Sequence, residues 1–164
     1  MSVSAEVLRQ HLAYTAWATD RLMRAVEQIP AEHFSHDFET ADRTILGTLV
    51  HTFGADRIWL KRVLGEPVTA FLTDEDRHLS ALQREWPVVL NRWHEWAETL
   101  DDQGAQAIVS FTDRQGNPFS SARWEIVLHV VNHGTHHRGQ VSGFLRKLGH
   151  TPPVLDLMWY YRGL

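Results

Sequence analysis

The chain has 164 residues, of which 43% are apolar and 22% charged, and its formal net charge is −4. This composition is that of an ordinary globular protein, and the absence of cysteine excludes disulfides, zinc–thiolate sites and a cysteine nucleophile. The charge balance argues against a nucleic-acid partner, and no apolar run reaches the roughly 18 residues of a membrane span. We therefore expect one domain over residues 1–164, located in the cytoplasm, with no nucleic-acid or membrane partner.

Apolar residues spaced three and four apart predict a first helix over residues 5–29, with Ser4 as its cap and Pro30 just beyond its end. A polar connection over residues 30–43 leads to a second predicted helix over 44–64, which Gly65 ends.

A third helix is predicted over residues 73–100, because Thr73 can cap it and three acidic residues follow. Pro87 lies inside this range and is expected to kink or divide the helix. The alternating apolar residues of 107–120, with a turn at 114–117, indicate a short β-hairpin or an extended excursion. A fourth helix follows over 121–148, so the predicted fold is an all-α four-helix bundle with this excursion between its third and fourth helices.

Histidines are concentrated in the fourth predicted helix, where four of the chain's eleven occur within nine positions: His129, His133, His136 and His137. Residues four apart lie on one helix face, so His129 pairs with His133, and His133 with His137. The outer two are about 12 Å apart along the axis, and one ion must therefore use one pair or the other. Gly134 removes bulk beside the second pair and weakly favours it. Either a metal ion or ordinary hydrogen bonds would remove the cost of burying these imidazoles.

A third ligand would have to come from another helix, and His51 is the candidate. It follows Leu49 and Val50 in an apolar helix, so it is either a hydrogen-bonded core residue or a ligand facing the bundle interior. Gly47 and Thr48, one turn earlier, would leave room nearby. His33 and His150, among the remaining histidines, fit solvated side chains.

Four segments of the chain resemble the DinB/YfiT-like metalloenzyme family. They are NHGTHHRGQ (132–140), LVHTFGADRIWL (49–60), YTAWATDRL (14–22) and PPVLDLMWYYRG (152–163). The resemblance implies an up-down-down-up four-helix bundle, often a homodimer, that binds one divalent ion through His51, His133 and His137. Position 136 is often aromatic in such relatives, and we interpret His136 as a rim residue. His129 is expected to contact the ligands or to line the pocket.

Three neutral histidines would leave part of the coordination shell open, whereas structural zinc sites are closed by four protein ligands. An open site favours chemistry or ligand binding, and imidazole ligands suit Zn, Ni, Fe or Mn. A zinc-protease reading is disfavoured because Gly134 stands where the glutamate base would be. A di-iron carboxylate site is rejected because the chain lacks the two Glu-x-x-His motifs.

The resemblance further implies transfer of low-molecular-weight thiols. The leading hypothesis is a metal-dependent enzyme, hydrolase-like or transferring such a thiol to a small electrophile, whose catalytic residues the sequence does not identify. The alternative is a non-enzymatic, stress-related, dimeric metal-binding bundle. Arg138 and Gln140 could orient ligands, and Arg138 could equally form an interhelix ion pair. Three tryptophans could wall a pocket or fill the core or a dimer interface: Trp17, Trp59 and Trp159.

Overall fold

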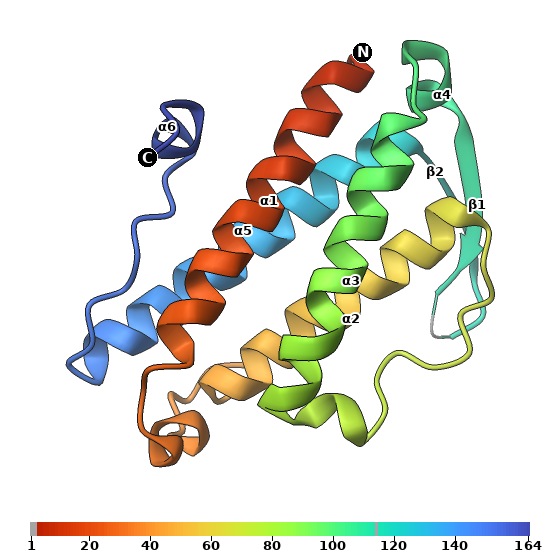
Figure 1. Cartoon of the computed structure of the whole chain (residues 1–164). Helices are drawn as coiled ribbons and strands as arrows, with labels where there is room; N and C mark the ends of the chain where they lie inside the picture. The colour runs from red at the N-terminus through yellow and green to blue at the C-terminus, as the bar shows by residue number, and fades with distance from the viewer. Residues whose placement is uncertain (1–2, 114) are drawn as a thin grey trace.

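The computed structural model describes residues 3–113 and 115–164, and in this part of the chain four long helices form a bundle. They are α1 (Ala5–Val26), α2 (Ile45–Leu64), α3 (Leu79–Glu98) and α5 (Arg123–Lys147). Figure 1 shows that α1 and α5 run in one direction, whereas α2 and α3 run in the other. This is the predicted up-down-down-up bundle.

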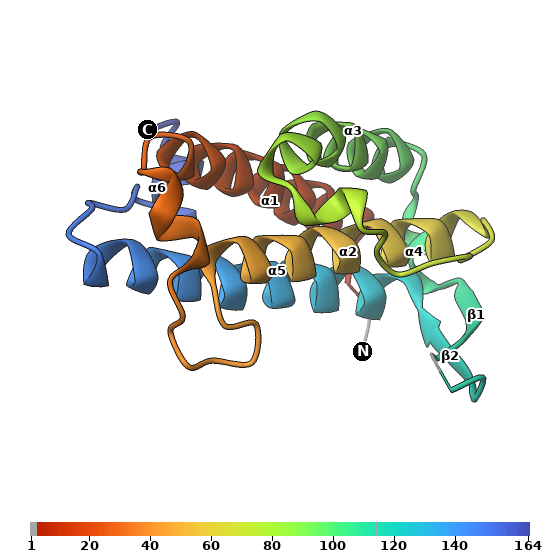
Figure 2. The ribbon, with the colours of Figure 1, turned by 90° about the horizontal axis from the view of Figure 1, so that it is seen from below.

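Each long helix packs against two others: α1 and α2 both contact α3 and α5. Seen from below in Figure 2, α1 and α3 form one layer, and α2 and α5 form the other. The consecutive helices α1 and α2 are therefore diagonal, and their connection contains the short 3₁₀ helix η1 (Ala31–Ser35). The arrangement places α2 directly beside α5, which is distant from it in sequence.

The acidic residue Asp56 lies among aromatic side chains of the bundle core. Asp56 of α2 is 1% exposed. The indole N–H of Trp86 donates to its carboxylate (2.8 Å) and that of Trp93 to its carbonyl oxygen (3.0 Å). Burial raises the pKa of Asp56 to about 7. Leucine, isoleucine and phenylalanine side chains fill much of the rest of the core, among them Leu8, Leu22, Ile45, Phe53, Leu60, Leu82, Ile126 and Leu145.

The starts of the first two helices and the end of the second follow the sequence signals closely, whereas α1 ends at Val26 rather than at the predicted Ile29. The Ser4 hydroxyl accepts the Val7 N–H at 3.4 Å, and the Thr44 hydroxyl accepts the Gly47 N–H at 2.9 Å. α2 ends at Gly65, whose φ of +70° is the left-handed conformation that glycine adopts at low cost.

The predicted start of the third helix is wrong. The Thr73 N–H and hydroxyl bind the Asp76 carboxylate at 2.6 and 2.9 Å instead of capping a helix. A separate 3₁₀ turn, η2 (Glu75–Arg77), follows, and α3 begins only at Leu79. Pro87 lies inside α3 without dividing it.

The excursion between α3 and α5 comprises a short helix and a hairpin: α4 (Asp102–Gln106), β1 (Ile108–Thr112) and β2 (Pro118–Ala122). The strands pair antiparallel with Phe111 opposite Phe119, which confirms the predicted hairpin; Arg114, in the expected turn, lies outside the described residues. Because β2 extends to Ala122, α5 begins later than predicted, at Arg123. The Glu125 carboxylate accepts the Ala122 N–H at 2.8 Å and caps the helix.

The C-terminal segment returns to the bundle and ends in α6 (Leu157–Tyr161). The Tyr14 hydroxyl donates to the Leu155 carbonyl (2.8 Å), and the Tyr160 ring packs against Tyr14.

The prediction that His33 and His150 are solvated side chains is wrong, since His33 Nδ1 and His150 Nε2 form a hydrogen bond of 2.9 Å. Over residues 3–113 and 115–164, none of the helices combines the length and apolar character needed to cross a bilayer.

Candidate metal centre

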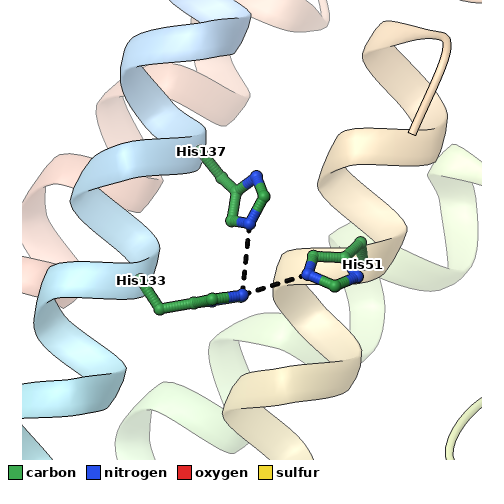
Figure 3. A group of neighbouring side chains, drawn as sticks. All are labelled: His51, His133 and His137. Carbon is green, nitrogen blue, oxygen red and sulfur yellow. Dashed lines mark hydrogen bonds between the residues drawn. The ribbon is translucent and has the colours of Figure 1, made fainter. Parts of the chain in front are cut away.

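Three imidazoles from two neighbouring helices point toward one another (Figure 3). His51 is on α2, whereas His133 and His137 lie one turn apart on the same face of α5. His133 Nε2 lies 3.0 Å from His51 Nε2 and 3.1 Å from His137 Nε2. One nitrogen from each of the three lies within 4.8 Å of the other two. The structure therefore brings together the three residues that the sequence singled out.

The spacing of these nitrogens fits a divalent cation. Tetrahedral coordination with metal–nitrogen bonds of about 2.0–2.1 Å places two ligand nitrogens about 3.3 Å apart, close to the 3.0 and 3.1 Å seen here. Hydrogen bonds alone satisfy the cluster poorly, because a neutral imidazole nitrogen carries either one proton or one lone pair. His133 Nε2 faces two partners and can bond well with only one. A single cation would engage all three lone pairs.

The Nδ1 atoms of His51 and His137, on the other side of each ring from Nε2, face oxygen acceptors. Gln140 Oε1 lies 2.6 Å from His137 Nδ1. The Asp42 carboxylate lies 3.7 Å from His51 Nδ1 and 3.9 Å from His137 Nδ1. A proton held on Nδ1 leaves the lone pair on Nε2, which is the tautomer that a metal requires. Gln140 thus has the orienting position that the sequence suggested.

Burial favours the neutral form of the two clustered histidines on α5. Burial foremost, followed by the charges of the neighbouring His137 and His51, lowers the pKa of His133 to about 4. Burial also lowers the pKa of His137, although the Gln140 hydrogen bond opposes this. Neutral imidazoles at pH 7 are ready to bind a cation without first losing a proton.

A cavity of about 530 Å³ adjoins the cluster, and His51 and His133 form part of its wall. The Trp59 ring packs edge-on against His129, with ring centres 5.2 Å apart. The Arg62 guanidinium lies 4.4 Å from the centre of the Trp59 ring and donates to the Thr112 carbonyl at 2.9 Å. The cavity is large enough for a small molecule.

Known proteins share this architecture. The sequence model that describes the DinB family matches residues 1–163 of this chain. This chain belongs to the DinB family. Protein DinB of Bacillus subtilis (strain 168) is 20% identical over 153 residues, which cover 90% of this chain and 89% of that protein. The crystal structure of a DinB-like protein from Bacillus cereus ATCC 10987 superposes with a TM-score of 0.69 at 18% identity, covering 94% of this chain and 99% of that one. The structural likeness supports the DinB fold.

The remaining histidines of this DinB family chain lie outside the cluster. His136 is exposed, as expected of a rim residue. His129 lines the cavity, with its ring centre 5.8 Å from that of His133. Of the three candidate pocket tryptophans, Trp59 lines this cavity. Trp17 packs instead on Tyr160, and Trp159 is 39% exposed in α6.

Two glycines have roles that differ from the expected ones. A Cβ at Gly134 would lie 2.8 Å from Arg138 Nη1, so this glycine makes room for Arg138. Arg138 is 4% exposed and donates to Thr135 (3.1 Å) and Thr19 (3.4 Å), which places it in the α1–α5 interface. A Cβ at Gly47 would lie 2.1 Å from the Asp42 carbonyl oxygen. That glycine allows the connection before α2 to approach the helix.

Asp42 is the site residue that the sequence did not reveal. It lies in an irregular connection with no periodicity, among several other charged residues. Gly47, in the first turn of α2, is the sequence feature that could have indicated Asp42, because a glycine there marks a close approach of the backbone.

Proposed function

We propose that His51, His133 and His137 bind one divalent cation, and that the protein is a metal-dependent enzyme acting on a small molecule in the adjoining cavity. The observation that carries this proposal is the convergence of three Nε2 atoms beside that cavity, whose wall includes His51 and His133. Three neutral ligands leave coordination positions vacant. Imidazole ligands are compatible with Zn²⁺, Ni²⁺, Fe²⁺ or Mn²⁺.

The reaction class that we propose is transfer of a low-molecular-weight thiol to a small electrophile. A bound cation would supply a Lewis acid that favours the thiolate form of a thiol at neutral pH. A sulfur–carbon bond forms, the bond from that carbon to its leaving group breaks with the electron pair, and the thiol proton passes to solvent. The chain has no cysteine, so the sulfur must come from a second small molecule.

The residues of the cavity suit such a pair of substrates. The Trp59 and Phe71 side chains provide apolar wall, which excludes water and favours a flat or apolar electrophile. Arg62 and His129 add polar groups at the same cavity, where they can orient a charged or hydroxylated substituent.

Metal analysis of protein purified without an affinity tag tests the first part. We expect one ion per chain in the wild type and none in His137→Ala. The matched control is His136→Ala, which removes the adjacent but exposed imidazole and should retain the ion. Circular dichroism must show that both variants are folded.

Thiol titration of the Co²⁺-substituted protein tests the second part. Cysteine and dithiothreitol should produce a sulfur-to-cobalt charge-transfer band, and turnover of a chromogenic aryl chloride should require thiol. If no thiol binds and the chelated protein simply unfolds, the metal has a structural role and the non-enzymatic alternative is correct.

The homodimer, the cytoplasmic location, the stress-related role and the single domain over 1–164 stay predictions. Sedimentation velocity of the purified protein tests the first of them directly.

A further inference from the structure

The connection before α2 places the Asp42 carboxylate near the Nδ1 atoms of two of the three clustered imidazoles, away from their converging Nε2 atoms. Asp42 Oδ1 lies 3.7 Å from His51 Nδ1 on α2, and Asp42 Oδ2 lies 3.9 Å from His137 Nδ1 on α5. We propose that Asp42 is a positioning residue that holds both rings with their Nε2 atoms toward the cation site. The inference rests on the proposed metal binding and adds a residue to that site.

The backbone around Asp42 is closely fixed. The Phe38 N–H donates to the Arg43 carbonyl at 2.7 Å, and the Asp37 carboxylate pairs with the Arg43 guanidinium. The backbone of Glu39 has a φ of 58° and that of Arg43 a φ of 62°. Residues other than glycine seldom adopt this left-handed conformation. The loop thus holds a specific shape between residues 37 and 44.

This loop is anchored to both helices that carry the histidines. The Phe38 ring stacks on Phe144 of α5, with ring centres 4.0 Å apart and planes at 11°. On α2, the Asp42 carbonyl occupies the space that a Cβ at Gly47 would need, only 2.1 Å from that position. Asp42 is therefore fixed relative to α2 and α5 together, and its two oxygens meet one histidine of each.

The chemistry of imidazole explains what the carboxylate would do. A histidine that binds a cation through Nε2 must carry its proton on Nδ1, and an acceptor there stabilises that tautomer and orients the ring. The separations of 3.7 and 3.9 Å exceed a hydrogen bond by about 1 Å, which a small movement of the carboxylate toward the rings closes. Its negative charge also offsets part of the charge of a dication held by neutral ligands. His137 has Gln140 as a second acceptor, so His51 should depend on Asp42 more.

Zn²⁺ affinity, measured by competition with a chromophoric chelator, tests the proposal. We expect Asp42→Asn to weaken Zn²⁺ binding about 10- to 100-fold. The matched control is Glu39→Gln, which removes the same charge from an exposed position in the same loop and should change affinity less than about twofold, because exposed charges are screened. Equal affinity in Asp42→Asn and wild type would overturn the proposal, and so would an equal loss in both variants.

Gly47→Ala provides a second variant that keeps every carboxylate. Its Cβ must displace the Asp42 carbonyl, so folded Gly47→Ala should also bind Zn²⁺ more weakly than wild type. This variant decides the question if Asp42→Asn fails to fold, since unchanged affinity in Gly47→Ala would contradict the proposed role.

A readout without metal separates this inference from the proposed function. In metal-free protein, ¹⁵N chemical shifts of the imidazoles report which nitrogen carries the proton. Asp42→Asn should reduce the fraction of His51 protonated on Nδ1, whereas Glu39→Gln should not. If the wild type binds no Zn²⁺, the proposed function has failed, and the His51 tautomer still decides whether Asp42 orients the ring. An unchanged tautomer would overturn the role of Asp42.

Discussion

Replacing Asp76 with asparagine should destabilise the protein by about 2 kcal/mol at pH 7. Asp76 is 5% exposed and accepts two hydrogen bonds from the Arg57 guanidinium, at 2.8 and 2.7 Å. The Thr73 N–H and hydroxyl add two more, at 2.6 and 2.9 Å. The Arg57 bonds foremost, and those of Thr73, lower the pKa of Asp76 from 3.8 to about 2. A change of this size corresponds to about 2 kcal/mol of stability.

The pH dependence of stability gives this prediction its sign. Because the pKa of Asp76 is lower in the folded protein than the ordinary 3.8, its contribution is fully present above pH 3.8 and is lost as the pH falls through about 2. About 1 kcal/mol should remain at pH 3. Urea unfolding of wild type and Asp76→Asn from pH 7 to pH 3 measures the difference.

The control for this measurement is Asp74→Asn, which changes a fully exposed carboxylate two residues away and should cost little. A loss below about 0.5 kcal/mol in Asp76→Asn would refute the reasoning, because an exposed ion pair is worth that little. A loss that does not shrink in acid would also refute it, because such a loss would not come from the ionised carboxylate.

The same pair has a functional consequence. Arg57 also donates to the Phe71 carbonyl at 3.0 Å, and Phe71 is a wall residue of the cavity beside His51. The Arg57–Asp76 pair therefore holds the segment that closes one side of the cavity. We expect Asp76→Asn to weaken thiol binding while Zn²⁺ affinity stays unchanged, since the variant leaves the histidines in place.

Three further predictions concern α5 and the histidine cluster. Gly139→Ala, whose Cβ meets nothing within 4 Å, should stabilise by about 0.5–1 kcal/mol in thermal unfolding. Gly134→Ala should be less stable than Gly139→Ala by about 1 kcal/mol, because its Cβ would lie 2.8 Å from Arg138 Nη1 and must displace that buried guanidinium. Metal-free protein should lose stability as the pH falls from 6.5 to about 4. The first value is the ordinary pKa of histidine, and the second is the pKa of His133 in the folded protein. Between them, His133 binds a proton in the unfolded chain but not in the folded one. His133→Asn should flatten that part of the curve. Free Zn²⁺ at 100 times its Kd should raise the unfolding free energy by about 2.7 kcal/mol in wild type and not in His51→Ala, as measured by urea unfolding.

Helix periodicity alone left two histidine pairs of α5 open, and the resemblance to the DinB family selected His133 and His137 together with His51 of α2. His133 and His137 must share a face once α5 is recognised, and an imidazole in the apolar run of α2 identified His51. The bundle followed from the same periodicity. The start of α3 could not be found in this way, since Thr73 has the sequence of a helix cap yet binds the Asp76 side chain, which the tertiary partner Arg57 holds in place.

Asp42 marks the limit of reasoning from local patterns. Its position depends on two left-handed residues, on a ring stacked against α5 and on a close approach at Gly47, none of which leaves a periodic signal. Gly134 shows the same limit in another form. A small residue beside two histidines suggested space for an ion, and the structure fills that space with the Arg138 side chain.

The topology of the bundle and the geometry of the site have one physical origin. Because α1 and α2 are diagonal, residues 27–44 must cross the end of the bundle to join them, which a short antiparallel turn could not do. The crossing chain passes against Phe144 of α5 before it reaches the first turn of α2. It therefore arrives at the seam where these two helices bring His51 and His137 together, and Asp42 is the residue that it places there. A variant with a shortened connection should consequently lose Zn²⁺ affinity even if all three histidines and the four long helices remain.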